Sequence, residues 1–322
     1  MMEYFDFNMQ LPDEWSDTDS ETTLTTKTPV GTPMEKPEAV DPSENATVSV
    51  SYAFHPYTSF DKLAPDLVLA SLDHVFFYVH YHKVLAASDN GFATLLSSCK
   101  FTLAEYPPIA AIPEPAEVLN IIVHTIYGMP ALEYHPSFET VSATLDALPR
   151  YGMSPKRIVV AGQPLYDLVV ACAPLHPIDT YALAAAHDLP DAAAAVSAHL
   201  LSFPLSALSD ELVNRMGPIY LKKLFFLHNG RIEALKHALI QPPVTHVETP
   251  DCTLIQQRRL TRAWALAAAH IMWEAGPNLS THLLQASLLP LQKELTCPKC
   301  KLTLRDRVAC LVVDWASVKR TI

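Results

Sequence analysis

Residues 65–98, PDLVLASLDHVFFYVHYHKVLAASDNGFATLLSS, decide the fold of this chain. Two short runs of β-branched, aliphatic and aromatic side chains occupy residues 67–69 and 75–79. Such runs are typical of buried strands, and the Asp-His pair at 73–74 between them is typical of a turn. The stretch therefore begins with two short strands joined by a tight connection.

After the second strand the hydrophobic period changes from that of a strand to that of a helix. Residues 84–87, Val-Leu-Ala-Ala, begin a helical pattern. Phe92, Leu95 and Leu96 then follow the i, i+3, i+4 spacing of one buried helix face. Ser88 separates the two pieces, and its hydroxyl can accept from the first free N–H groups of the second piece. We expect two short helices here.

The next segments continue the alternation of strand and helix. Residues 109–112 predict a short strand, and residues 118–126 predict a helix with one apolar face. Gly128 would end this helix in the left-handed conformation, and Pro130 prevents its continuation. Residues 137–148 predict a further amphipathic helix with a serine cap.

This order of elements resembles the start of a BTB/POZ domain. The resemblance implies an α+β module that acts through protein surfaces, by self-association or by recruiting cullin ligases or transcriptional partners. The whole chain looks most like the BTB-domain proteins that are numerous in basidiomycete fungi, also in its segments RRLTRAWALA, CPKC and VVDWASVKRTI. The residues that carry the resemblance are Asp66, His80 or His82, Val84-Leu85-Ala86-Ala87, Ser88, Phe92 and Tyr127-Gly128.

We expect an α+β fold in which a BTB/POZ-like module of short strands and helices precedes an all-helical C-terminal part. The expected divisions are a disordered acidic tail at 1–49, a BTB/POZ-like domain at 50–160, a helical extension at 161–241 and a C-terminal helical unit with a CPKC turn at 242–322. The helices predicted after residue 160 cover residues 164–172, 178–188, 191–201, 206–215, 218–227, 231–240, 256–273, 278–289 and 305–318.

Charge and composition exclude several classes of protein. Of the net charge of −11, residues 1–49 carry eleven acids and two lysines, whereas the remainder carries 23 acids and 21 basic residues. No basic stripe stands out, which argues against nucleic-acid binding. The acidic N-terminus lacks a signal peptide, and polar residues interrupt the most apolar tract, 181–201, so we expect no membrane partner. Six cysteines do not suggest a disulfide framework. These features predict an intracellular protein of the cytoplasm or nucleus.

The N-terminal segment interleaves large apolar residues with acids between residues 3 and 15, ending at Trp15. Such a segment either docks on a partner or is an ordinary acidic tail. Thr28-Pro and Thr32-Pro are potential phosphorylation sites, although short motifs of this kind recur by chance.

One metal-binding spacing is present, at Cys297-Pro-Lys-Cys300. Two thiolates separated by two residues can chelate one zinc ion, but a structural site needs four ligands. Residues that could complete the site are Cys310, Cys252, His282 and His270. The alternative is a turn between two helices with reduced, partly buried cysteines. No other cofactor is expected.

Sequence motifs do not indicate an enzyme, since no nucleophile elbow, Walker loop, H-E-x-x-H or dinucleotide fingerprint occurs. We therefore expect a non-enzymatic protein–protein interaction protein. The alternatives are a cullin-type ubiquitin-ligase substrate adaptor and a transcription-linked scaffold that uses its acidic tail. Val84, Leu85 and Phe92 are candidates for a homodimer face, or else are simply core residues.

Overall fold

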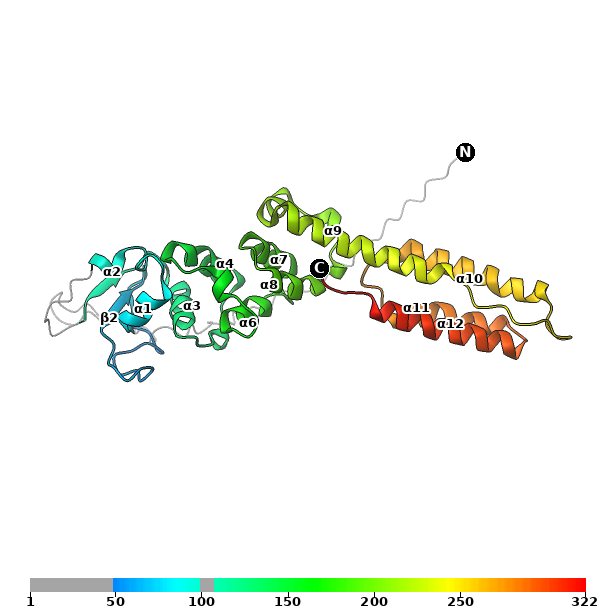
Figure 1. Cartoon of the computed structure of the whole chain (residues 1–322), viewed down its shortest axis with the longest axis horizontal. Coiled ribbons are helices and arrows are strands. Elements are labelled where there is room, and N and C mark those ends of the chain that lie inside the picture. Colours follow the sequence, from blue (N-terminus) through cyan, green and yellow to red (C-terminus); the bar gives the residue numbers. More distant parts are fainter. Residues whose placement is uncertain (1–48, 99–106) are drawn as a thin grey trace, which may run out of the picture.

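The computed structural model describes residues 49–98 and 107–322, which form an elongated molecule (Figure 1). A small sheet lies at one end, and helices make up the rest, so the chain is of the α+β class (Figure 1). The interpretations of the acidic segment at 3–15 and of Thr28 and Thr32 fall outside the described residues. Within the described part, no helix is both long and apolar enough to cross a membrane.

The sheet has four strands in the order β1-β3-β2-β4. Its centre is the predicted hairpin, in which β2 and β3 run antiparallel with Leu67 opposite Val79. β1 joins β3 and β4 joins β2, both in parallel. The strands are β1 (Ser49–Val50), β2 (Leu67–Ala70), β3 (Val75–Val79) and β4 (Ile109–Ala111). All three strands predicted from the sequence are confirmed.

The two short helices after the hairpin are only partly as predicted. Ser88 has the expected role, because its Oγ accepts from the Phe92 N–H at 2.7 Å. However, Phe92 lies in a turn with a φ of 54°, and the second helix begins only at Leu95. The Phe92 ring is fully buried and stacks on Tyr151 with the ring centres 4.5 Å apart. This tertiary contact outweighs the local helical period.

The two histidines near the first helix differ in burial, although their ring centres are only 5.7 Å apart. His82 lies in the first turn of the helix Tyr81–Ala87 and not on the strand, so the expected alternation across a strand end does not apply to it. His80 is buried, and its ring nitrogens lie 2.7 Å from the Tyr127 hydroxyl and 2.9 Å from the Leu63 carbonyl oxygen. His82 is exposed on the surface and pairs with Asp61 at 3.2 Å. The polar groups of His80 are thus satisfied inside the module.

Helices pack around the sheet and continue beyond it without a break in the core. Leu119, Leu145 and Tyr181, on three different helices, belong to one apolar cluster that extends from Phe54 to Leu224. The cluster therefore crosses residue 160, where a division between domain and extension was expected. Its helices are α1 (Tyr81–Ala87), α2 (Leu95–Ser98), α3 (Ala116–Ile126), α4 (Phe138–Ala147), α5 (Pro155–Ile158), α6 (Pro164–Ala171), α7 (Pro177–Ala186) and α8 (Pro190–Ser197), with 3-10 turns at Leu132–Tyr134, Leu148–Tyr151, Ala198–Ser202 and Leu205–Ala207.

A single long helix, α9 (Asp210–Ile240), connects the two ends of the molecule (Figure 1). The sequence predicts three separate helices here, at 206–215, 218–227 and 231–240. The break between the first two corresponds to a kink at Gly217, which has a φ of 70°, but the predicted break between the second and third is wrong. The Asn-Gly pair at 229–230 does not end the helix, because buried side chains on both sides of it are packed. Leu224 belongs to the first apolar cluster and Leu235 to a second one.

The second cluster lies among the C-terminal half of α9, α10 (Leu254–Glu274), α11 (Thr281–Leu288) and α12 (Pro298–Ser317). A 3-10 turn at Leu289–Glu294 precedes α12. The helices form a four-helix arrangement, in which each is in contact with the next and α12 returns to α9. We call this part, residues 235–322, the C-terminal unit. The predicted start of the last helix at residue 305 was seven residues late, because Cys297 is its N-cap.

One buried cation fastens the chain end to α9. Arg231 is only 2% exposed and donates to the carbonyl oxygens of Pro277, Val318 and Lys319 at 2.6–3.0 Å. Its guanidinium also lies over the Trp315 ring, 4.2 Å from the ring centre. Such a charge is tolerated in the interior because its donors are paired.

Candidate metal centre

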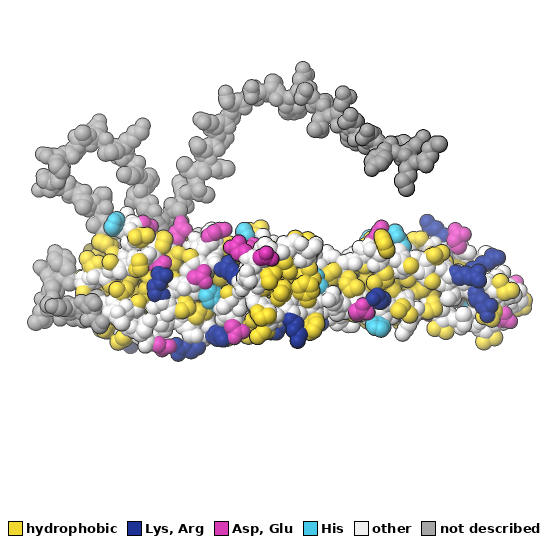
Figure 2. Space-filling model, turned by 90° about the horizontal axis from the view of Figure 1, so that it is seen from above, with side chains coloured by type: hydrophobic (Ala, Val, Ile, Leu, Met, Phe, Trp, Pro, Cys, Tyr) yellow, Lys and Arg dark blue, Asp and Glu magenta, His cyan; other side chains and the backbone are white. Residues whose placement is uncertain are grey.

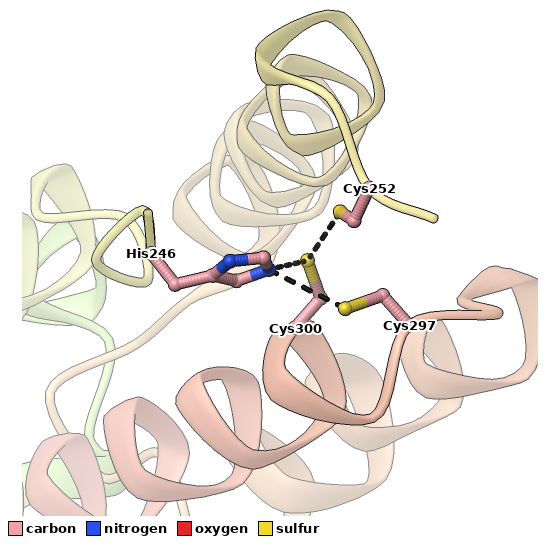
Figure 3. Close-up of side chains that lie close together, drawn as sticks. All are labelled: His246, Cys252, Cys297 and Cys300. Atoms are coloured by element: carbon pink, nitrogen blue, oxygen red, sulfur yellow. Dashed lines mark hydrogen bonds between the residues drawn. The ribbon is translucent and has the colours of Figure 1, made fainter. Parts of the chain in front are cut away.

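Four side chains converge where two helices begin (Figure 3). Cys297 is the N-cap of α12, and Cys300 lies in the first turn of that helix. Cys252 comes directly before Thr253, the N-cap of α10, and His246 lies six residues earlier in the connector. Their donor atoms all lie within 4.8 Å of one another. The centre thus joins a connector to a helix some 45 residues further along the chain.

Local hydrogen bonds hold Cys252 at the edge of α10. The backbone N–H groups of Thr249 and Cys252 each donate to the other's carbonyl oxygen, which closes a tight turn. Thr253 and Gln256 then form a capping box that begins the helix. The chain is therefore fixed on both sides of the Cys252 thiol.

The ring of His246 is oriented for a ligand role. Its backbone N–H donates to the Gln257 side-chain oxygen at 2.9 Å, and its Nδ1 lies 2.8 Å from the Val247 carbonyl oxygen. A carbonyl can only accept, so Nδ1 carries the proton and Nε2 has a free lone pair. That Nε2 faces the sulfur atoms of Cys297 and Cys300 (Figure 3).

The separations between donor atoms match a tetrahedral zinc site. The Nε2 of His246 lies 3.3 Å from the Cys300 sulfur and 3.4 Å from the Cys297 sulfur. The sulfur atoms of Cys252 and Cys300 are 3.7 Å apart. Tetrahedral bonds of usual length to zinc place two sulfurs about 3.8 Å apart, and a nitrogen and a sulfur about 3.5 Å apart. The donor set and the spacing both fit this ion.

The three thiols of the cluster differ in the direction in which their surroundings shift their pKa. Backbone N–H groups at the start of α12, first that of Cys300, donate to the Cys297 sulfur and lower the pKa of this thiol to about 7. Burial raises the pKa of Cys252, and it raises the pKa of Cys300 to about 12. Neighbouring thiolates in a buried site repel one another, and a divalent cation removes that repulsion. Cys297 is therefore the first thiol to ionise, and a cation would favour ionisation of the others.

The structure brings together only some of the residues considered from sequence. It unites Cys297, Cys300 and Cys252, whereas Cys310 is exposed on α12 and lies outside the cluster. His270 and His282 are also outside it. Sequence reasoning missed His246 altogether. The available signal was its position in a Pro-rich connector, with H-x5-C just before a capped helix and C-x2-C at the start of another.

The residues suggested for a homodimer face are divided between core and surface. Val84 and Phe92 are completely buried in the first apolar cluster, and Leu85 is 44% exposed. Val84 and Phe92 thus take the alternative role considered for them, as core residues.

Comparisons with protein families, curated proteins and solved structures find no match to this chain.

Proposed function

We propose that this chain is a non-enzymatic protein–protein interaction protein whose C-terminal unit is held together by a structural zinc ion. The observation that carries the proposal is the cluster of His246, Cys252, Cys297 and Cys300. Three thiolates and one imidazole are a donor set typical of structural zinc sites, in which all four coordination positions belong to the protein. Catalytic zinc sites keep one position for water or substrate, which this set of four does not leave.

The size of the surrounding core gives the metal a physical role. Among the described residues, only fourteen buried side chains form the second apolar cluster, and two of them are Cys252 and Cys300. Units with so small a core commonly depend on a metal or on disulfides for stability. Zinc would link residues 246 and 252 of the connector to the start of α12. This link would stabilise the end of the four-helix arrangement that is remote from Arg231.

Protein interaction is the role we assign to the chain as a whole. The α+β architecture of the N-terminal part supports it, because it has the predicted hairpin, strand β4 and helices α3 and α4 in BTB-like order. An elongated molecule also presents much surface per residue to partners (Figure 1). Exposed Tyr52, Tyr57 and Leu63 beside the sheet are apolar groups available for contact.

The metal proposal is tested by elemental analysis of the full chain, purified in the presence of a thiol reductant and without chelator. We expect about one zinc ion per chain. Cys300→Ser should lose the ion, whereas Cys310→Ser, a matched change on the same helix, should retain it. Substitution of cobalt should give the visible absorption of a tetrahedral thiolate site in the parent and in Cys310→Ser only. A fully reduced chain that takes up neither metal would contradict the proposal.

Partner identity distinguishes the two kinds of interaction protein. Affinity purification of the full chain from cells, followed by mass spectrometry, should recover a cullin if the chain is a ubiquitin-ligase adaptor. If it is a transcription-linked scaffold, the full chain should alter expression of a reporter gene to whose promoter it is tethered. Deletion of residues 1–45 should abolish that effect and leave the zinc content of the chain unchanged. Recovery of no partner protein at all would contradict the interaction role.

A further inference from the structure

An apolar groove runs between α9 and α10 in the C-terminal unit. Its floor and walls include Leu239, Ile240, Trp264, Ala268 and Met272, and it encloses about 320 Å³. Almost all of the surface that it exposes is apolar. Grooves of this kind between two helices commonly take up an apolar segment of a protein.

The outward face of α10 extends this groove. Ile255, Leu266 and Trp273 are 71%, 75% and 90% exposed. Their separations of eleven and seven residues correspond to about three and two turns, so they lie along one side of the helix. This side of α10 adjoins the groove, because Ala265 and Ala269, which line the groove, lie next to it on the helix surface. An exposed tryptophan in line with two aliphatic side chains is typical of a contact surface.

Positive charge lies along the rim of the same groove. Lys236 lines it on α9, where it is paired with Glu233 at 2.7 Å, and Arg258 and Arg262 lie on the side of α10 that continues its wall. Figure 2 shows Lys and Arg side chains gathered at this end of the molecule. Residues 242–322 contain ten basic and six acidic residues, although the chain as a whole is acidic. An occupant of this groove should therefore combine apolar and acidic side chains.

One segment of the chain itself has that chemistry. Residues 1–26 include seven acids and no lysine or arginine. Between residues 3 and 15 the acids alternate with large apolar side chains, among them Phe5, Phe7 and Trp15. The 33 residues from 16 to 48 can span at most about 110 Å when extended. Ser49, where the described chain begins, lies in the sheet at the other end of the molecule, so the segment has to extend past the first core and along α9, a kinked helix of about 46 Å (Figure 1).

We propose that residues 3–15 bind in the groove between α9 and α10 of the same molecule. The apolar side chains contact Trp264, Ala268 and Met272, and the acids pair with Arg258 and Arg262. It goes beyond the proposed function, and its readout is peptide binding rather than metal content.

The test uses a fluorescent peptide of residues 1–20 and the full chain with Phe5→Ala, Phe7→Ala and Trp15→Ala, so that the chain's own segment does not compete. Fluorescence anisotropy should show saturable binding that weakens as salt concentration rises. Adding Arg258→Glu and Arg262→Glu should weaken binding about tenfold or more. A matched control, Lys293→Glu with Arg320→Glu, changes the charge of the unit equally and should leave binding unchanged. Thermal melting confirms that each variant is folded.

Intramolecular binding is tested with the parent chain, whose own segment should reduce affinity for the peptide about tenfold or more, because a tethered segment has a high effective concentration. Three results would overturn the proposal: no binding of the peptide, equal weakening by both pairs of charge changes, or equal affinity of the parent and the tail-substituted chains.

Discussion

The two apolar clusters of this molecule are unequal, although one helix joins them. Among the described residues, the cluster around the sheet has 43 buried apolar side chains and the cluster in the C-terminal unit has fourteen. The larger cluster is held by packing of aliphatic and aromatic side chains from strands and short helices. In the smaller one, polar groups fix the arrangement: Arg231 on three carbonyls, Trp264 on the Leu239 carbonyl and Trp315 on the Leu279 carbonyl.

The difference shows that directional contacts carry a larger share of the stabilisation in the small core than in the large one, which also has buried hydrogen bonds such as that of Tyr181 to the Tyr220 carbonyl. Burial of apolar surface is non-directional and grows with the area removed from water. A unit with few buried side chains gains less from it and must gain more from hydrogen bonds and metal ligands, which also fix geometry. The four residues of the candidate metal centre lie at the end of the unit away from Arg231, so the two kinds of anchor would be complementary.

The largest expected effect is that of metal removal. A strong chelator added to the reduced full chain should abolish amide protection in α10, α11 and α12 and leave α3 and α7 protected. Structural zinc contributes about 10–16 kcal/mol in zinc-finger peptides, which is comparable with the whole stability of a domain. Hydrogen exchange read by mass spectrometry measures the effect for each helix. Equal loss of protection in both clusters would show that they are not separately stabilised.

Phe77→Ala tests the other side of the comparison. Phe77 is 1% exposed within the large cluster, beside Phe54. Its truncation should cost about 3–5 kcal/mol of unfolding free energy through lost burial and a cavity. Denaturant melting measures this, and zinc content should not change. Tyr57→Ala, at a residue 90% exposed, serves as control and should change stability by less than about 0.5 kcal/mol. Loss of zinc in Phe77→Ala would refute independence of the two clusters.

Arg231→Met should destabilise the C-terminal unit by about 1–3 kcal/mol, because it removes the donor to three partly buried carbonyl oxygens. The apolar stem is kept, so packing against Trp315 changes little. Hydrogen exchange of α9 and α12 after the substitution measures the effect, with Lys222→Met on the exposed side of α9 as control. If both substitutions have the same small effect, the polar anchor is not what stabilises the small core.

The smallest expected effect concerns His228, a buried residue of α9. Burial lowers the pKa of His228 in the folded chain, and no hydrogen-bond partner of its Nε2 is found in the described part. The unfolded chain then binds more protons just below pH 6.5, so stability falls as pH falls and levels off below the folded-state pKa. A single group contributes at most about 1.4 kcal/mol per pH unit. Stability measured between pH 7 and 5 should depend less on pH in His228→Gln; an unchanged slope would exclude His228 as the source.

Local sequence determined the elements whose signals lie within a few residues. Strand propensity and turn chemistry predict the hairpin at 67–79, which is present. Free N–H groups at helix starts predict the roles of the Ser88 and Ser137 hydroxyls, and helix termination predicts the left-handed Gly128; all three are observed. Half of the metal centre was also visible, since C-x2-C brings two thiols together within one turn. These features depend on residues close to one another in the chain, so they can be predicted without knowledge of the tertiary structure.

Only the tertiary structure decided the continuity of α9 and the completion of the centre. Asn229-Gly230 carries a stop signal, but packing of the helix into both clusters outweighs a local cost of about 1 kcal/mol. His246 and Cys252 meet Cys297 and Cys300 because α10 and α12 begin at the same end of the four-helix arrangement. No short-range pattern encodes that meeting. It depends on how four amphipathic helices bury their apolar faces against one another, and this is a property of the whole unit.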